Sequence, residues 1–235
     1  MPEPILTISG LNAYYGDFQA LYDLHMTVGE GEVLAIVGAN GAGKTTLLRA
    51  ISGLILNEAR QITYRGEAIG ALRADQVALC GIALVPEGRQ LFPSLSVEEN
   101  LLIGGQAGRA GPWSLDAVFR LFPVLEERRA MSSTALSGGQ QQMVAIGRAL
   151  MANPDLLLFD EISLGLAPVI IKTIYEALPG IVGGGMTAVI VEQDITKALA
   201  VSSRVYCLQE GRVSLEAASD TVSRENIARA YFGVA

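Results

Sequence analysis

The chain has 235 residues, which is enough for one large domain with a buried core. Half of the residues are hydrophobic, 17% are charged, and the net charge at pH 7 is −7. Because proteins that bind a nucleic-acid backbone present basic patches, we expect no nucleic-acid partner. The apolar excess has two compatible interpretations: a parallel sheet that is buried on both faces, and an apolar docking surface for a membrane partner.

No stretch of the sequence is expected to cross a membrane, which takes roughly 20 mainly apolar residues. The longest uncharged stretch, residues 130–147, is rich in Ser, Gly and Gln, and residues 177–191 contain Pro179 and three consecutive glycines. Residues 1–4 include an acid and two prolines, so they do not resemble a secretory signal peptide. Cys80 and Cys207 lack the spacing of metal ligands, and we expect free thiols in a reducing compartment.

The predicted elements alternate between short apolar strands and helices, a pattern that favours a mostly parallel α/β sheet. Residues 5–28 are expected to form an antiparallel β layer, and the mainly helical residues 88–153 an inserted helical subdomain. Strands are predicted at 5–11, 21–28, 33–37, 61–64, 82–85, 156–159, 187–191 and 204–208, and helices at 44–52, 98–103, 115–122, 140–151, 168–178 and 195–201.

A phosphate-binding pattern follows the apolar run 33–37. The pattern G-x-x-x-x-G-K-[ST] is matched by Gly38, Ala39, Asn40, Gly41, Ala42, Gly43, Lys44 and Thr45, and Thr46 comes next. Glycines allow successive backbone N–H groups to turn toward phosphate oxygens, and the following helix adds its positive end. We expect Lys44 to contact the outer phosphates of a nucleotide and the Thr45 hydroxyl to bind Mg²⁺. The alternative is an ordinary glycine turn, which the strand before it and the helix after it argue against.

Two acids end the apolar run 156–159. Asp160 is the candidate carboxylate on the metal side, and Glu161 is the candidate general base that polarises a water for attack on the γ-phosphate. An apolar strand that ends in an acid is common, so this pattern indicates a catalytic site only in combination with the phosphate loop.

A second anion site is predicted where the helix 140–151 begins, at Leu136, Ser137, Gly138, Gly139 and Gln140. One nucleotide does not need two such sites from one chain. These residues resemble the L-S-G-G-Q signature of the nucleotide-binding domains of ABC transporters, and the resemblance extends over essentially the whole chain. It implies a P-loop ATPase whose RecA-like core comprises about 1–87 and 154–235 of a single domain, with ATP and Mg²⁺ as ligands. It also implies that two domains meet head to tail, each signature completing the other domain's site.

A closer resemblance is to the ATP-binding subunit of the high-affinity branched-chain amino acid importer. The segments that carry it are residues 85–89, 97–101, 139–151, 163–168 and 191–193. It implies a peripheral subunit on the cytoplasmic face of the membrane, bound to transmembrane permease subunits and served indirectly by an external substrate-binding protein. The second ATP-binding subunit is either an identical copy or a sister chain. Importers of urea, amides or other amino acids are hard to separate from this one.

The resemblance assigns further residues, some of them with an alternative. Tyr15 stacks on adenine, or is a turn tyrosine packed on the sheet edge. Arg89, Leu91 and Phe92 contact the permease, or the two apolar residues belong to the core of the helical subdomain. Glu87 occupies the position of a switch-loop glutamine and is a candidate Mg²⁺ ligand.

Several positions depart from the broader family. Gln193 stands where most members have histidine; its amide can donate to the γ-phosphate but cannot carry charge. His25 precedes the phosphate loop and is expected to be an ordinary structural or surface residue. Ile162 replaces a usual proline, and residues 57–60 lack a usual Ser-Gly turn.

Two other functions compete with transport. A soluble ABC ATPase of DNA repair or translation would carry coiled coils or two fused cassettes, and neither is visible here. A regulatory module that holds ATP without useful hydrolysis is motivated by Glu87 and Gln193, while Lys44, Asp160 and Glu161 argue against it. No N-K-x-D motif of a GTPase occurs.

Overall fold

A computed structural model describes residues 4–232, without the side chains of Arg224 and Phe232. Of the N-terminal residues that were compared with a signal peptide, residues 1–3 lie outside this range. The chain divides into two compact units, the first formed by residues up to Val77 and from Thr187 onward, and the second by Ala78–Met186. Each unit is described by itself.

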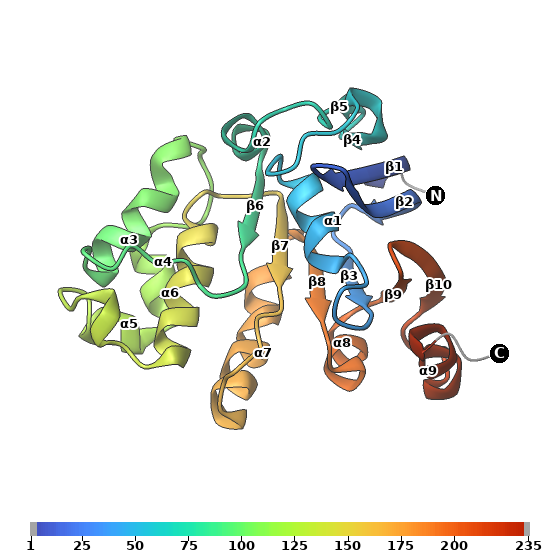
Figure 1. Ribbon diagram of the computed structural model, residues 1–235. Helices are drawn as coiled ribbons and strands as arrows, with labels where there is room; N and C mark the ends of the chain where they lie inside the picture. Colours follow the sequence, from blue (N-terminus) through green and yellow to red (C-terminus); the bar gives the residue numbers. More distant parts are fainter. Residues whose placement is uncertain (1–3, 233–235) are drawn as a thin grey trace. The chain divides into compact units, whose positions relative to one another are not determined.

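The first unit contains the predicted antiparallel layer. Strands β1 (Pro4–Tyr15) and β2 (Phe18–Gly29) pair along most of their length and are joined by a two-residue turn at Gly16 and Asp17 (Figure 1). The sheet continues through two short strands, in the order β2-β1-β4-β5, with β4 at Ile62–Tyr64 and β5 at Glu67–Ala68. Both long strands extend beyond the predicted ranges because the hairpin remains paired to its tip.

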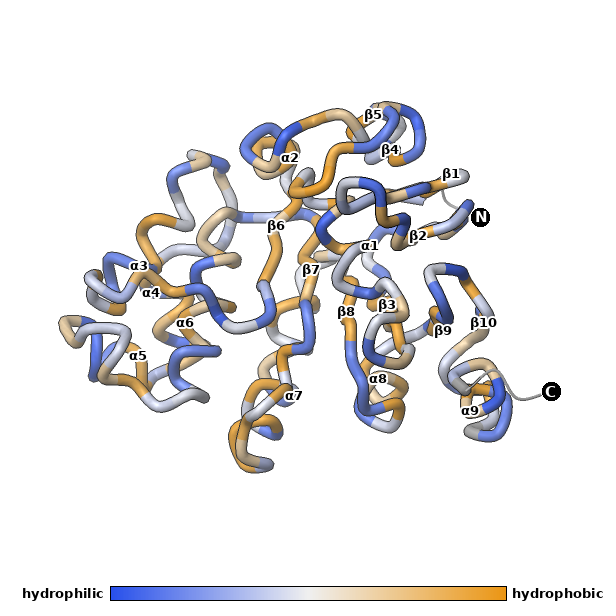
Figure 2. Tube along the Cα trace, in the orientation of Figure 1, coloured by the Kyte–Doolittle hydropathy of each residue, from blue (hydrophilic) through white to orange (hydrophobic). Residues whose placement is uncertain are grey.

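The first unit also contains four further strands. β3 (Val33–Val37) pairs in parallel with β8 (Thr187–Glu192) on one side and β9 (Arg204–Gln209) on the other, and β10 (Arg212–Ala218) pairs antiparallel with β9. β8 is buried along its whole length and Figure 2 colours most of it as hydrophobic, which confirms the interpretation of such apolar runs as buried strands.

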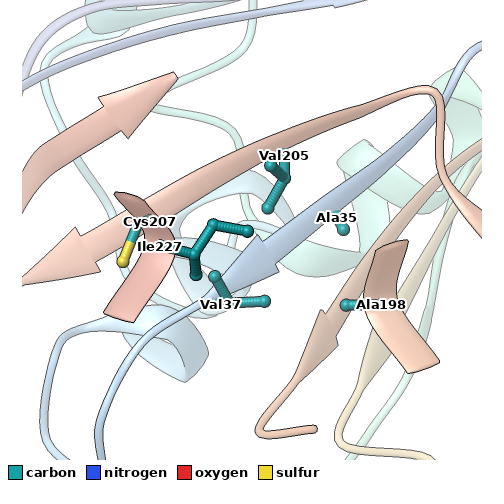
Figure 3. Close-up of a cluster of buried hydrophobic side chains, with 6 residues drawn as sticks. All are labelled: Ala35, Val37, Ala198, Val205, Cys207 and Ile227. Atoms are coloured by element: carbon teal, nitrogen blue, oxygen red, sulfur yellow. The ribbon is translucent and has the colours of Figure 1, made fainter. Parts of the chain in front are cut away.

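Helices α1 (Lys44–Ile51), α8 (Ile195–Val201) and α9 (Arg224–Phe232) complete this unit. Figure 3 shows where α8 and α9 contribute to the core: Ile227 points toward Val37, Ala198 lies beside β3, and Cys207 belongs to the same cluster. Cys207 is fully buried, and this burial raises the pKa of its thiol. Both cysteines are free, as expected.

The second unit pairs β6 (Ile82–Val85) in parallel with β7 (Leu156–Asp160) and is otherwise mainly helical. Helix α3 (Val97–Gly104) packs against α6 (Gly138–Leu150) in this unit. A Cβ at Gly147 would lie 2.7 Å from side-chain atoms of both Leu101 and Val118, so this glycine permits the close approach. The remaining helices are α4 (Leu115–Leu121), α5 (Pro123–Glu127) and α7 (Pro168–Val182).

The predicted helical subdomain of residues 88–153 falls inside this second unit, and its boundaries stay a prediction. α2 (Ala74–Cys80) spans the division between the units. Three short 3₁₀ segments occupy Ala59–Gln61, Gly105–Ala107 and Ser133–Ala135. The 3₁₀ segment Ala59–Gln61 overlaps residues 57–60, which lack the usual Ser-Gly turn.

Helix α7 corrects one prediction. The predicted range, 168–178, ends just before Pro179, which cannot donate a hydrogen bond to the preceding turn. The helix continues to Val182, and the amide of Gly183 donates to the carbonyl of Pro179 over 2.8 Å. The buried face formed by Ile174, Leu178 and Ile181 runs past the proline, so packing offsets the missing hydrogen bond.

Arg204 ties several strands of the first unit together. Its guanidinium binds both carboxylate oxygens of Glu32 at 2.8 and 2.9 Å, one oxygen of Glu216 at 2.6 Å, and the carbonyl of Thr27. The Glu32 hydrogen bond is the main reason that the pKa of Arg204 is raised, so the side chain stays charged.

We expect Arg204→Met to lower the free energy of unfolding by about 2 kcal/mol, because it leaves the largely buried Glu32 carboxylate and the exposed Glu216 carboxylate without their shared cation. Arg212→Met is the matched control, since Arg212 lies over the Tyr22 ring at 5.1 Å and its loss is expected to cost less than about 0.5 kcal/mol. Urea unfolding measures both. Equal losses for the two variants would contradict this role for Arg204.

Candidate functional site

The phosphate loop occupies the turn between β3 and α1, as predicted. Gly41 has φ +81° and Gly43 has φ +100°, both in the left-handed region that glycine adopts without strain. A Cβ at Gly43 would lie 2.6 Å from the Leu21 side chain, and one at Gly38 would collide with the carbonyl of Leu208. The pattern of glycines is therefore required by the local backbone, and the loop has the form of a phosphate cradle.

Lys44 begins α1 and is buried, with 4% of its surface exposed. Its ammonium group donates to the carbonyl oxygens of Gly38 at 2.8 Å and Ala39 at 3.1 Å. The Lys44 ammonium group thus lies over the loop and is bound by two neutral carbonyl oxygens. Negatively charged phosphate oxygens would bind it more strongly and could replace them. Thr45 is half-buried and Thr46 buried in the same first turn. The positive charge of Lys44 and the hydroxyl groups of Thr45 and Thr46 suit the phosphates of a nucleoside triphosphate.

Tyr15 lies at the tip of the β1–β2 hairpin, beside this helix. Its hydroxyl is 3.5 Å from the Thr46 hydroxyl and accepts a hydrogen bond from Arg49 at 3.4 Å, while 42% of the residue remains exposed. The structure therefore brings Tyr15 next to the phosphate-loop helix with part of its surface in solvent. Stacking on adenine stays a prediction.

Gln193 lies between β8 and α8 and is half-buried. The next residue, Asp194, caps α8 by accepting from the amides of Thr196 and Lys197, so the position of Gln193 is fixed by the strand before it and the cap after it. His25 is on β2, with its ring 3.2 Å from an Asp23 oxygen and its side chain 64% exposed. It is a surface residue, as expected.

In the second unit, the two acids have different surroundings. Asp160 is the last residue of β7 and is buried, with 3% exposed. Glu161 follows it with φ +49°, a left-handed conformation that costs a residue with a side chain about 1–2 kcal/mol. Its side chain is half-buried. Strain of this kind gathers at functional sites, and here it distinguishes Glu161 from its neighbour. Ile162, in place of the usual proline, is buried in the core.

The signature residues form the start of α6, as predicted. Ser137 caps the helix by accepting from the amide of Gln140 at 3.3 Å, and the side chain of Gln140 accepts from the amide of Ser137 at 3.0 Å. Gly139 is buried where a Cβ would collide with Ile170, whereas Gly138 is half-buried. The capping box sets the direction of the helix start, and the helix dipole adds positive charge there.

The segment of residues 87–92, called here the switch segment, has an unusual backbone. Glu87 is exposed, and Gly88, Arg89 and Gln90 follow with φ of +74°, +66° and +45°. For the two residues with side chains this costs about 2–4 kcal/mol together. Arg148 of α6 offsets the cost by donating to the carbonyl of Gln90 at 2.8 Å and to that of Arg89 at 3.2 Å.

The end of the switch segment is held by side chains that the sequence did not single out. Asn100 donates to the carbonyl of Phe92 and accepts from its amide at 2.9 Å, and the Ser133 hydroxyl donates to the same carbonyl at 2.9 Å. The Phe92 ring is 45% exposed and Leu91 is half-buried, so neither is simply a core residue. Their contact with a permease stays a prediction.

The candidate residues are thus shared between the units. The first unit brings together Tyr15, the phosphate loop and the strand that ends before Gln193; the second carries Glu87, the signature, Asp160 and Glu161. Hydroxyl and carboxylate oxygens of Thr45, Asp160 and Glu87 are the hard donors that Mg²⁺ prefers. Within residues 4–232, no group of three or more His, Cys, Asp or Glu side chains is arranged to hold a metal ion.

Comparison with known proteins gives consistent matches. A family model described as ABC transporter matches residues 21–163. The high-affinity branched-chain amino acid transport ATP-binding protein BraG of Pseudomonas aeruginosa is 41% identical over 97% of this chain and all of its own length. The probable branched-chain amino acid transport ATP-binding protein LivF of Archaeoglobus fulgidus is 31% identical over 95% of this chain and 97% of its own.

Solved structures agree with the sequence matches. An ATP-binding cassette of an ABC transporter superimposes with a TM-score of 0.84 and 26% identity, covering 97% of this chain and 99% of its own. A dimeric cassette in a post-hydrolysis state, bound to ADP and phosphate, superimposes with a TM-score of 0.80 and 26% identity, covering 91% of this chain and 98% of its own. The predicted P-loop ATPase fold of the ABC type, with its mostly parallel core sheet and antiparallel layer, is confirmed.

Proposed function

Since the chain belongs to the ABC transporter family of ATP-binding proteins, we propose that it is the ATP-hydrolysing subunit of an importer of branched-chain amino acids. The observation that carries the ATPase assignment is the braced phosphate loop with Lys44 lying over it. The substrate assignment is supported by the 41% identity with BraG over its full length.

The phosphate loop is proposed to bind the triphosphate. Backbone N–H groups of Gly41, Gly43 and Lys44 face the phosphate oxygens, and the Lys44 ammonium exchanges its two carbonyl acceptors for the β- and γ-phosphates. Tyr15 is proposed to stack on the adenine ring from the hairpin tip. In this scheme, charge binds the phosphates of the nucleotide, and an aromatic ring binds its base.

Hydrolysis is proposed to proceed by in-line attack of water on the γ-phosphate. Glu161 accepts the proton of the attacking water, and the Gln193 amide donates a hydrogen bond to a γ-phosphate oxygen. A bound Mg²⁺ would neutralise charge on the phosphates, with Thr45, Asp160 and Glu87 as its protein donors. With Glu87 in place of an amide, the contact to a bound Mg²⁺ would be stronger, and negative charge would be added beside the phosphates.

The signature of one copy is proposed to complete the site of another ATP-binding subunit. The helix start at Ser137, Gly138 and Gly139 offers amides and a positive dipole end to the γ-phosphate held by that subunit. A solved relative is dimeric with ADP and phosphate bound. We infer a pair with a sister ATP-binding subunit or a second copy, bound to transmembrane permease subunits at the cytoplasmic face of the membrane, with an external binding protein delivering the substrate.

Over the part of the chain that the structure describes, no helix has the length and apolar character needed to cross a lipid bilayer.

The test is to isolate this chain from its native membrane with its partners and to measure ATP hydrolysis of the complex with and without leucine and its binding protein. We expect co-purification with a permease and stimulation by leucine. Related ATP-binding proteins of glutamate/aspartate and glutamine transport, at 32% identity, define the alternative substrates. Stimulation by one of those amino acids in place of leucine would overturn the substrate, and failure to recover any membrane partner would overturn the transport role.

A further inference from the structure

The tip of the β1–β2 hairpin is linked to helix α1 by hydrogen bonds, and this link carries an inference about how the base of a nucleotide is bound. We propose that Arg49 is a positioning residue that holds the Tyr15 ring in place for stacking on the base. The inference rests on the proposed function, because it deepens the role given there to Tyr15. It adds a side chain that acts through Tyr15 and not on the nucleotide itself.

The first observation is that the Tyr15 ring has little packing of its own. Tyr15 is the last residue of β1, directly before the turn at Gly16 and Asp17, and 42% of it is exposed. Its partner across the hairpin, Phe18, is 69% exposed. A ring at such a tip can adopt several rotamers, and ordering it when a ligand binds lowers the affinity for that ligand.

The second observation is the support that α1 gives to this ring. The Arg49 guanidinium donates to the Tyr15 hydroxyl over 3.4 Å, and the same hydroxyl lies 3.5 Å from the Thr46 hydroxyl. Thr46 and Arg49 are three residues apart, so they lie on one face of the helix. The helix that begins at Lys44, beside the phosphate loop, therefore also fixes the hydroxyl end of Tyr15.

The third observation is the direction of these hydrogen bonds. A guanidinium group has donors and no acceptor, so the Tyr15 oxygen accepts from Arg49, and its own proton is directed toward the Thr46 oxygen. The Thr46 proton is then left for another acceptor, and ionised phosphate oxygens only accept. Tyr15 therefore keeps both hydrogen bonds when the Thr46 hydroxyl binds a phosphate, so the support remains in place with a nucleotide bound.

Arg49 is also a residue whose side chain can be changed without loss of the helix. Its carbonyl accepts from the amides of Leu54 at 2.9 Å and Ile55 at 3.1 Å, and from the Ser52 hydroxyl, so backbone bonds close the end of α1. The side chain of Arg49 is exposed, so removing its guanidinium leaves no cavity. Its loss should therefore act on Tyr15 and not on the stability of the fold.

The experiment measures the dissociation constants of ATP and of inorganic tripolyphosphate, which has no base, for the purified full-length chain. Arg49→Met keeps the aliphatic stem, and Tyr15→Phe keeps the ring. We expect each variant to weaken ATP binding by about 3- to 10-fold and to leave tripolyphosphate binding within about twofold. The double variant should lose no more than Tyr15→Phe alone, because the bond is shared. Arg49→Lys, whose ammonium also donates, should recover most of the affinity for ATP.

Arg60→Met is the control, since Arg60 is an exposed arginine of the same unit, and both dissociation constants should be unchanged. Equal weakening of ATP and tripolyphosphate in Arg49→Met would show a charge effect on the phosphates and overturn the inference. Unchanged ATP binding in that variant would also overturn it. If Arg49→Met does not fold, Tyr15→Phe decides by the same two constants.

Two further measurements separate this failure from a failure of the proposed function. Tyr15→Ala should weaken ATP binding at least as much as Tyr15→Phe and leave tripolyphosphate binding unchanged. If Tyr15→Ala binds ATP as tightly as the unaltered chain, the stacking role of Tyr15 is wrong, and the inference is wrong with it. If the unaltered chain binds no ATP, the proposed function itself fails.

Discussion

Lys44→Met is expected to weaken ATP binding by about 100-fold and to reduce hydrolysis at least as much. The Lys44 ammonium group is the one full positive charge that the phosphate-loop pattern supplies to the β- and γ-phosphates. Removing a single preorganised charge or donor of this kind costs about 10²–10³ in rate. In the structure it is held by two carbonyl oxygens, at 2.8 and 3.1 Å, so it lies over the loop before nucleotide arrives.

The measurement is nucleotide binding by fluorescence titration together with ATPase rate. Lys172→Met is the matched control, because Lys172 is a surface residue of α7 whose side chain is 74% exposed beside Glu176. That variant should bind and hydrolyse ATP normally. Normal ATP affinity in Lys44→Met would show that residues 38–45 form an ordinary glycine turn, the alternative raised from the sequence.

Glu161→Gln should leave ATP binding within a few-fold of normal and lower turnover by about 10²–10⁴-fold, the range that a general base contributes. The amide has the same shape as the carboxylate but cannot accept a proton from water. Because the substitution preserves size and the backbone at φ +49° is unchanged by it, its effect should be chemical and not structural.

The chain offers a close control for Glu161. Glu210 is also a glutamate in the left-handed region, with φ +48°, but it lies in the exposed turn between β9 and β10. Glu210→Gln should change neither binding nor turnover. Full turnover in Glu161→Gln would show that this residue is not the general base. Loss of ATP binding in that variant would show that its role is structural.

The parts of the fold that could be predicted are those with a strong local signal. Val33–Val37, Ile82–Val85 and Ile195–Val201 were predicted with the bounds that the structure shows, because continuous apolar runs between turn residues or a regular helical spacing define them. β10 was missed, although Val213, Leu215 and Ala217 alternate with polar residues. β10 lies at the edge of its sheet, and its residues alternate between exposed and half-buried. The hydrophobic pattern of its sequence is therefore weaker than that of a fully buried strand.

The site divides in the same way. The phosphate loop, the acidic strand end and the signature are contiguous motifs, so their elements could be placed from sequence. Arg148 and Arg204 could not be found, because the partners of such residues lie far along the chain. Arg148 reaches a carbonyl 59 residues away, and Arg204 reaches Glu32 across 172 residues. No periodicity or spacing distinguishes these side chains from exposed ones of the same type.

The bracing of the phosphate loop has a thermodynamic consequence. Gly38 lies against the carbonyl of Leu208, Gly43 against Leu21, and the amide of Gly211 donates to the carbonyl of Ala42 at 3.1 Å. The loop is therefore ordered by folding itself, through neighbours on β2, β9 and the turn after β9. Nucleotide binding at this loop should then lose little free energy to ordering the loop, and in the proposed pair of ATP-binding subunits more of it would remain to hold the two subunits together.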